Sequence, residues 1–184
     1  MAVRVPHLMA LLLLAPFVAH AAPVALTPVD LELVIASDNS QSIDPTEAAL
    51  ERQGVAAAFR NDEVVKAIQS GALGKIAVAY LDWSSAPFTR IVLDWRIIED
   101  KASAEAFAAA LLAARPPYGQ GTAIGEAIAL AARMIETNAF EGTQRVIDVA
   151  GDGPNNTGRP GRAGARRARR SRHHHQRATY RGDR

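Results

Sequence analysis

Side chains that carry hard oxygen atoms gather in three short segments of the chain. Asp38, Ser40 and Ser42 stand two residues apart, Thr122 follows a glycine, and Asp152 stands between two glycines. Residues two apart in a turning loop can aim at a common point. Carboxylates and hydroxyls suit Mg²⁺ or Mn²⁺ in octahedral geometry. A metal site is therefore the chemistry that these five residues could support together.

The elements expected around these segments would bring them to one place. Leu31–Ser37 is a short apolar run that predicts a buried strand ending at Asp38, and Arg145–Ala150 predicts another strand just before Asp152. A helix is expected over Ala123–Glu136, directly after Thr122. In open α/β sheets, ligands bind beyond the carboxyl ends of the strands. All three segments should then lie at that edge.

The remaining elements complete an alternating pattern. Asp44-Pro45, with Glu47 three residues after Asp44, is typical of a helix start. The other expected elements are a helix to about Arg60, a second helical piece from Asn61 to Gly71, strands Lys75–Trp83 and Thr89–Trp95, and a helix over Ala102–Ala114. Thr89–Trp95 should be an edge strand that forms a hairpin with Lys75–Trp83, with Ile91, Leu93 and Trp95 on one face. The order predicts an α/β fold, a doubly wound, mostly parallel sheet with helices on both faces.

Each candidate residue also has an ordinary structural interpretation. Asp38 and Asp152 could cap turns, Thr122 could be a helix N-cap, and Ser40 and Ser42 could be plain loop serines. Two other acidic residues, Asp82 and Asp94, are expected at the rim or in solvent. The sequon Asn155-Asn156-Thr157 is a match that is common by chance. The convergence of the three segments favours the metal site.

The three segments resemble the metal-ion-dependent adhesion site of von Willebrand factor A domains. Their surroundings, VDLELVIASDNSQSID, YGQGTAIGEAI and RVIDVAGDGPNN, are similar to a bacterial exported branch of that fold with no assigned function. The resemblance covers Val29 to about Gly158, and it implies the strand order 3-2-1-4-5-6. The family often has Thr or Ser where this chain has Gly151.

The resemblance also implies a ligand set and a function. Residues matching Ser40, Ser42 and Thr122 contact the metal, and those matching Asp38 and Asp152 hold it through water. The implied protein is a secreted, adhesion-type binding module that holds the carboxylate of a partner protein through Mg²⁺.

Composition removes most enzyme classes. The chain has no cysteine, and its histidines are His7, His20 and His173–His175. A Ser-His-Asp triad or a zinc hydrolase cannot be built between Ala22 and Gly158, so we do not expect an enzyme. The alternative is a metal-dependent hydrolase in which Asp38 or Asp152 would act as general base.

Charge is divided unevenly along the chain. Residues 159–184 contain 10 arginines and one aspartate, which leaves 11 basic and 18 acidic residues elsewhere, a net charge of −7. An acidic body gives no support for nucleic-acid binding.

The Arg-rich tail, residues 159–184, is expected to be out of frame. Codons can be chosen for Arg169–Gly182 that read VAAGITINGLPIV one base later, a helix end followed by an apolar strand. The domain, residues 29–158, would then lack its last elements, and a non-functional fragment is a further alternative. Because no apolar segment follows Gly158, we expect the strand Arg145–Ala150 to have an unpaired edge and the chain to be poorly soluble.

The first residues are typical of an export signal. Arg4 is followed by an apolar run over Leu8–Val18 and by Ala19-His20-Ala21. The run is too short to span a bilayer, which takes roughly 20 residues. We therefore expect a signal peptide over residues 1–21, a linker over 22–28, and a periplasmic or secreted protein without a membrane span.

Cleavage of the signal peptide can be tested directly. Mass spectrometry of exported protein should find an N-terminus at Ala22 or within a residue or two of it, because the small-residue site ends at Ala21. Exported material that keeps Met1 would contradict this prediction.

Overall fold

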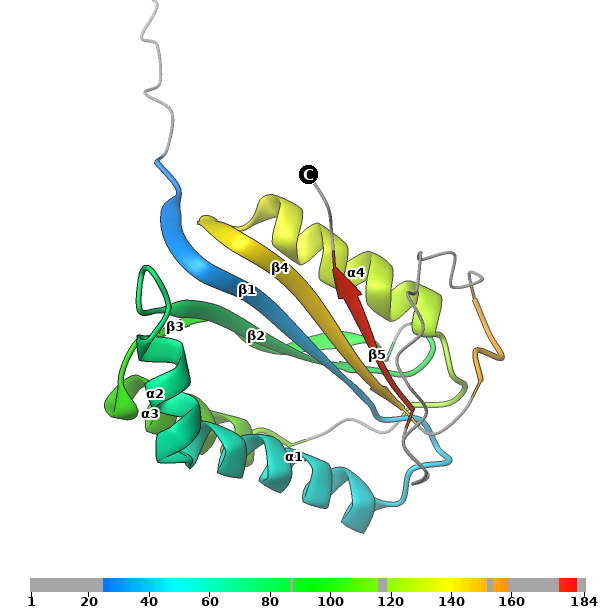
Figure 1. Cartoon of the computed structure of the whole chain (residues 1–184). Coiled ribbons are helices and arrows are strands. Elements are labelled where there is room, and N and C mark those ends of the chain that lie inside the picture. Colours follow the sequence, from blue (N-terminus) through cyan, green and yellow to red (C-terminus); the bar gives the residue numbers. More distant parts are fainter. Residues whose placement is uncertain (1–24, 87, 116–118, 152–153, 159–175, 182–184) are drawn as a thin grey trace, which may run out of the picture.

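The computed structural model describes residues 25–86, 88–115, 119–151, 154–158 and 176–181. Its centre is a mixed sheet with the strand order β3-β2-β1-β4-β5 (Figure 1). The strands are β1 (Thr27–Asp38), β2 (Ile76–Trp83), β3 (Arg90–Ile98), β4 (Phe140–Gly151) and β5 (Gln176–Arg181). Strand β1 lies between β2 and β4 and runs parallel to both, and β3 pairs antiparallel with β2. The strand order expected of a von Willebrand factor A-like sheet is confirmed from β3 to β4.

Helices cover both faces of the sheet. The helices are α1 (Pro45–Arg60), α2 (Asp62–Gln69), α3 (Lys101–Ala113) and α4 (Ile124–Thr137). Figure 1 shows α1, α2 and α3 on one face and α4 on the other. Alternate residues of β1 face two separate cores. Ile35 packs in the core beneath α1, α2 and α3, whereas Val34 and Ala36 pack in the core beneath α4. The predicted α/β class is confirmed.

The edge strand β3 differs from its expected pattern in one respect. Leu93 belongs to the core beneath α1 and α3, but Trp95 packs against the core beneath α4. The register with β2 shifts between Val78 and Tyr80, where three steps along β3 oppose two along β2. An extra residue of this kind turns the following side chains to the other face. The expectation that Ile91, Leu93 and Trp95 share one face was therefore wrong.

The far edge of β4 is covered by a strand from the tail. Strand β5 pairs antiparallel with β4, from Val146 opposite Arg181 to Gly151 opposite Gln176. The expectation of an unpaired edge at Arg145–Ala150 was wrong, because backbone pairing does not require an apolar sequence. Whether residues 159–184 are out of frame stays a prediction.

Two expectations concern membranes. Within the part of the chain that the structure describes, no helix is both long and apolar enough to cross a bilayer. The expected signal peptide, residues 1–21, lies outside the described residues.

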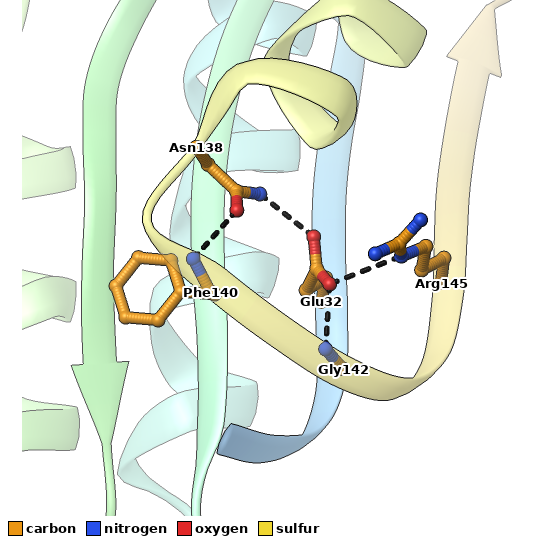
Figure 2. A network of polar contacts seen from close by, with 5 residues as sticks. All are labelled: Glu32, Asn138, Phe140, Gly142 and Arg145. Atoms are coloured by element: carbon orange, nitrogen blue, oxygen red, sulfur yellow. Dashed lines mark hydrogen bonds and ion pairs between the residues drawn. The ribbon is translucent and has the colours of Figure 1, made fainter. Parts of the chain in front are cut away.

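A buried carboxylate joins β1 to the start of β4. Glu32 is completely buried, and it accepts hydrogen bonds from Asn138 Nδ2 at 2.7 Å and from the Gly142 amide at 2.6 Å (Figure 2). Arg145 Nε lies 3.1 Å from the same carboxylate. Asn138 is itself oriented, because its Oδ1 accepts from the Phe140 amide at 2.7 Å. Glu32 thus fixes the turn from α4 into β4 against the central strand.

Glu32→Gln should lower the free energy of unfolding by about 2 kcal/mol. Both Glu32 oxygens now accept hydrogen bonds, so the new amide would place a donor against another donor. Asn138 cannot turn its side-chain amide around to offer an acceptor, because its Oδ1 would then no longer accept from the Phe140 amide. Chemical denaturation measures the change. Glu99→Gln, at an exposed position, is the control and should change the free energy by less than about 0.5 kcal/mol. Equal effects of the two substitutions would show that the hydrogen bonds to Glu32 do not contribute measurably to the free energy of unfolding.

Candidate functional site

The loop after β1 is clamped between the end of β2 and the loop before α4. The Asn39 amide donates to the Trp83 carbonyl at 2.7 Å, and the Asn39 carbonyl accepts from the Gly119 amide at 3.1 Å. Ser40 and Gly119 form an isolated parallel bridge. Two loops that are 80 residues apart in the sequence therefore lie side by side at the carboxyl edge of the sheet.

Three of the predicted ligands share this loop. Asp38 is buried at the end of β1, and its Oδ1 accepts from the Ser40 amide at 2.8 Å. Ser40 Oγ lies 3.0 Å from Ser42 Oγ. Ser40 is buried and Ser42 is exposed, so the pair of hydroxyls leads from the interior to the surface.

The end of this loop is fixed by the start of α1. Asp44 Oδ1 accepts from the Thr46 amide at 2.6 Å and from the Glu47 amide at 3.0 Å. These hydrogen bonds hold the pKa of Asp44 below its usual value. The helix start predicted at Asp44-Pro45 is confirmed, and the Ser40–Ser42 segment is anchored on both sides.

Thr122 lies in a buried turn of its own. Its amide donates to Asn156 Oδ1 at 2.8 Å, and its Oγ1 accepts from Asn156 Nδ2 at 3.4 Å. Its carbonyl accepts from the Asn156 amide at 2.9 Å. The N-cap of α4 is Ala123, without a side-chain hydrogen bond, so the N-cap interpretation of Thr122 was wrong.

The turn that carries Thr122 also rests on the end of β2. The Ala123 amide donates to the Ser84 carbonyl at 3.1 Å, and the Ser85 amide donates to the Gln120 carbonyl at 3.2 Å. Gly121 has a φ of +75°, in the left-handed region that favours glycine. Thr122 and the Asp38–Ser42 loop are therefore both held by the chain around Trp83–Ser85.

Asp152 and Gly153 lie outside the described residues, but Gly151 before them and Pro154 after them are described. A Cβ on Gly151 would lie 3.0 Å from Asp38 Oδ2 and 2.9 Å from Trp83 Cζ2. Four residues after Asp152, Asn156 holds Thr122. Gly151 thus lies beside Asp38, and Asn156 lies beside Thr122.

The spacing of two described hydroxyls suits a magnesium ion. Two neighbouring ligands of an octahedral Mg²⁺, each ~2.1 Å from the metal, lie ~3.0 Å apart. Ser40 Oγ and Ser42 Oγ, which form a hydrogen bond with each other, have this separation. The described residues contain no group of three or more His, Cys, Asp or Glu side chains that could bind a metal, so a site formed by the described residues alone would need hydroxyl ligands.

A buried ion pair beneath the loop was missed by the sequence analysis. Asp82 and Arg52 form a close salt bridge, and their side chains are only 2% and 6% exposed. The expectation that Asp82 faces the rim was wrong, whereas Asp94 is exposed as expected. Burial raises the pKa of Asp82, and the Arg52 guanidinium opposes that rise. A signal was present, since Arg52 lies on the buried stripe of α1, at helical spacing from Ala48, Val55, Ala56 and Phe59.

The asparagines of the apparent sequon were also missed as structural residues. Asn155 Oδ1 accepts from the Gly125 amide at 3.2 Å, in the first turn of α4, and Asn155 Nδ2 donates to the Thr157 carbonyl at 3.1 Å. Together, Asn155 and Asn156 attach the chain after β4 to the Thr122 turn and to the start of α4.

Gly151→Ala should lower the free energy of unfolding by about 2 kcal/mol, because the added Cβ would crowd Trp83 and Asp38. The control is Gly54→Ala in α1, where a Cβ meets nothing within 4 Å. That substitution should be neutral or stabilise by up to ~1 kcal/mol, since alanine favours a helix. Denaturant titration of both variants measures the difference. If Gly151→Ala leaves the free energy of unfolding unchanged, the Trp83 side chain must be able to move and make room for the methyl group.

Comparisons with known proteins place the chain in a family. It matches the family described as "Protein of unknown function (DUF1194)" over residues 28–174. No significant match was found among curated proteins. Similar solved structures include the vWF domain of the type V pili tip protein Mfa5 from Porphyromonas gingivalis, at 15% identity and a TM-score of 0.42, covering 65% of this chain and 36% of that one. The pilus adhesin SpaC from Lactobacillus rhamnosus GG is similar at 18% identity and a TM-score of 0.44, covering 66% of this chain and 15% of that one. The chain therefore spans about a third or less of these proteins. Because the family match extends over most of its length, the chain belongs to the DUF1194 family.

Proposed function

We propose that this protein is a binding module that holds a partner protein through Mg²⁺ or Mn²⁺ at the carboxyl edge of its sheet. Ser40, Ser42 and Thr122 would bind the metal directly, and Asp38 and Asp152 would bind it through water. The observation that carries the proposal is the 3.0 Å separation of Ser40 Oγ and Ser42 Oγ in a loop clamped on both sides. The bound ion would supply an electrophilic centre for a carboxylate of the partner.

Binding is favoured over catalysis by the residue types at this edge. Between Ala22 and Gly158 there is no histidine or cysteine. A hydrolase at this edge would have to use Asp38 or Asp152, both of which the proposed site assigns to holding the metal, as its general base. We further propose that the protein acts in the periplasm or outside the cell.

Magnesium should stabilise the protein by mass action. At a Mg²⁺ concentration about a hundredfold above Kd, the gain is ~2.7 kcal/mol, which should raise the melting temperature by about 5 °C or more. Ser42→Ala should abolish most of this rise and leave the metal-free melting temperature nearly unchanged, because Ser42 is exposed. Thermal unfolding with Mg²⁺ and with a chelator measures both values.

The matched control is Gln41→Ala, which changes the exposed neighbour of Ser42 and should keep the full response to Mg²⁺. An equal rise in wild type and Ser42→Ala would show that the ions act elsewhere. Hydrolysis of a phosphate or carboxylic ester, lost in Ser42→Ala and kept in Gln41→Ala, would replace the binding function with the hydrolase.

A further inference from the structure

The buried pair Arg52–Asp82 lies directly beneath the loop that holds the predicted ligands. Arg52 reaches the pair from the second turn of α1, and Asp82 is the second-last residue of β2. Arg52 also donates to the Ala114 carbonyl at 3.2 Å, just after the end of α3, and lies 5.5 Å from the centre of the Tyr80 ring. One side chain thus ties the helix after the loop to β2 and to the end of α3.

Asp82 is joined to the loop through the backbone of its neighbour Trp83. The Trp83 carbonyl accepts from the Asn39 amide at 2.7 Å, and the Asn39 carbonyl accepts from the Gly119 amide at 3.1 Å. The Asn39 side chain is itself buried. The ion pair therefore fixes the end of β2 that holds Asn39.

An ion pair is an expensive way to fill this space. Burying both charges costs several kcal/mol of solvation, and apolar residues of similar volume often stabilise a protein as well or better. The surface pair Arg60–Glu105 joins the same two helices, α1 and α3, without that cost. Holding the helices together thus does not require a buried charge, and the position beneath Asn39 is what distinguishes the Arg52–Asp82 pair.

We propose that Arg52 and Asp82 are positioning residues that hold Asn39, and with it the Asp38–Ser42 loop, in the shape in which its oxygens bind a metal. The metal-binding part of this inference rests on the proposed function. The positioning of the loop can be measured without any metal.

The test combines two variants. Arg52→Met with Asp82→Leu removes the pair and keeps the space filled, and Asp82→Asn keeps the size of the side chain and removes its charge. In the metal-free protein, hydrogen exchange of the Asn39 and Gly119 amides should become about tenfold faster in both variants, because these amides make the bonds that clamp the loop. The Kd for Mg²⁺, measured by calorimetry, should rise about tenfold in both.

The matched control is Arg60→Met with Glu105→Leu, which removes the surface pair between the same helices and should change exchange and Kd by less than about twofold. Unchanged loop exchange in either folded variant would overturn the proposal, and Asp82→Asn decides if the double variant does not fold. If the wild type binds no Mg²⁺, the proposed function fails, and the exchange measurement still decides whether the pair positions the loop.

Discussion

The parallel alignment of β1 with both of its neighbours is the constraint on which the rest of the structure depends. Because β1, β2 and β4 run in the same direction, their carboxyl ends meet at one edge, and every loop that follows them is brought there. Because helices cover both faces, most buried side chains of β1 and β2 are apolar, and polar residues gather mainly where the strands end. The candidate site is therefore a consequence of strand direction as much as of the residues in the loops.

Two ion pairs, each with a buried carboxylate, lie toward opposite ends of this parallel core. Glu32 and Arg145 join β1 to β4 near the start of β4, and Arg52 and Asp82 join α1 to β2 near the site. A buried ion pair is weak evidence for stability, but removing one partner is costly because the remaining charge stays in a low dielectric. The first pair controls how the chain enters β4, and the second supports the loop at the other end.

The sequence predicted the elements of the body and the meeting of its loops. Periodic apolar runs and turn residues located β1 to β4 and the four helices within a few residues, and the strand-end argument brought the Asp38 and Thr122 segments to one edge. The sequence did not predict contacts between polar residues that lie far apart along the chain. Nothing local distinguishes Asp82 in a strand from a rim aspartate, because its burial depends on an arginine 30 residues away. The bulge that turns Trp95 away from Leu93 is likewise decided by pairing, and a polar segment such as β5 has no apolar alternation to reveal it.

The close contact of Gly151 with Trp83 also limits the order in which this site could change during evolution. A hydroxyl side chain at position 151 would have to occupy space that the fully buried indole now fills, 2.9 Å from where its Cβ would stand. Replacing Trp83 with a smaller residue first would open that space, but it would also forfeit the hydrogen bond from the indole to the Ala36 carbonyl. A hydroxyl at position 151 therefore becomes sterically possible only after Trp83 has become smaller, and that first step has its own cost. While the tryptophan is present, glycine is the residue that fits at position 151.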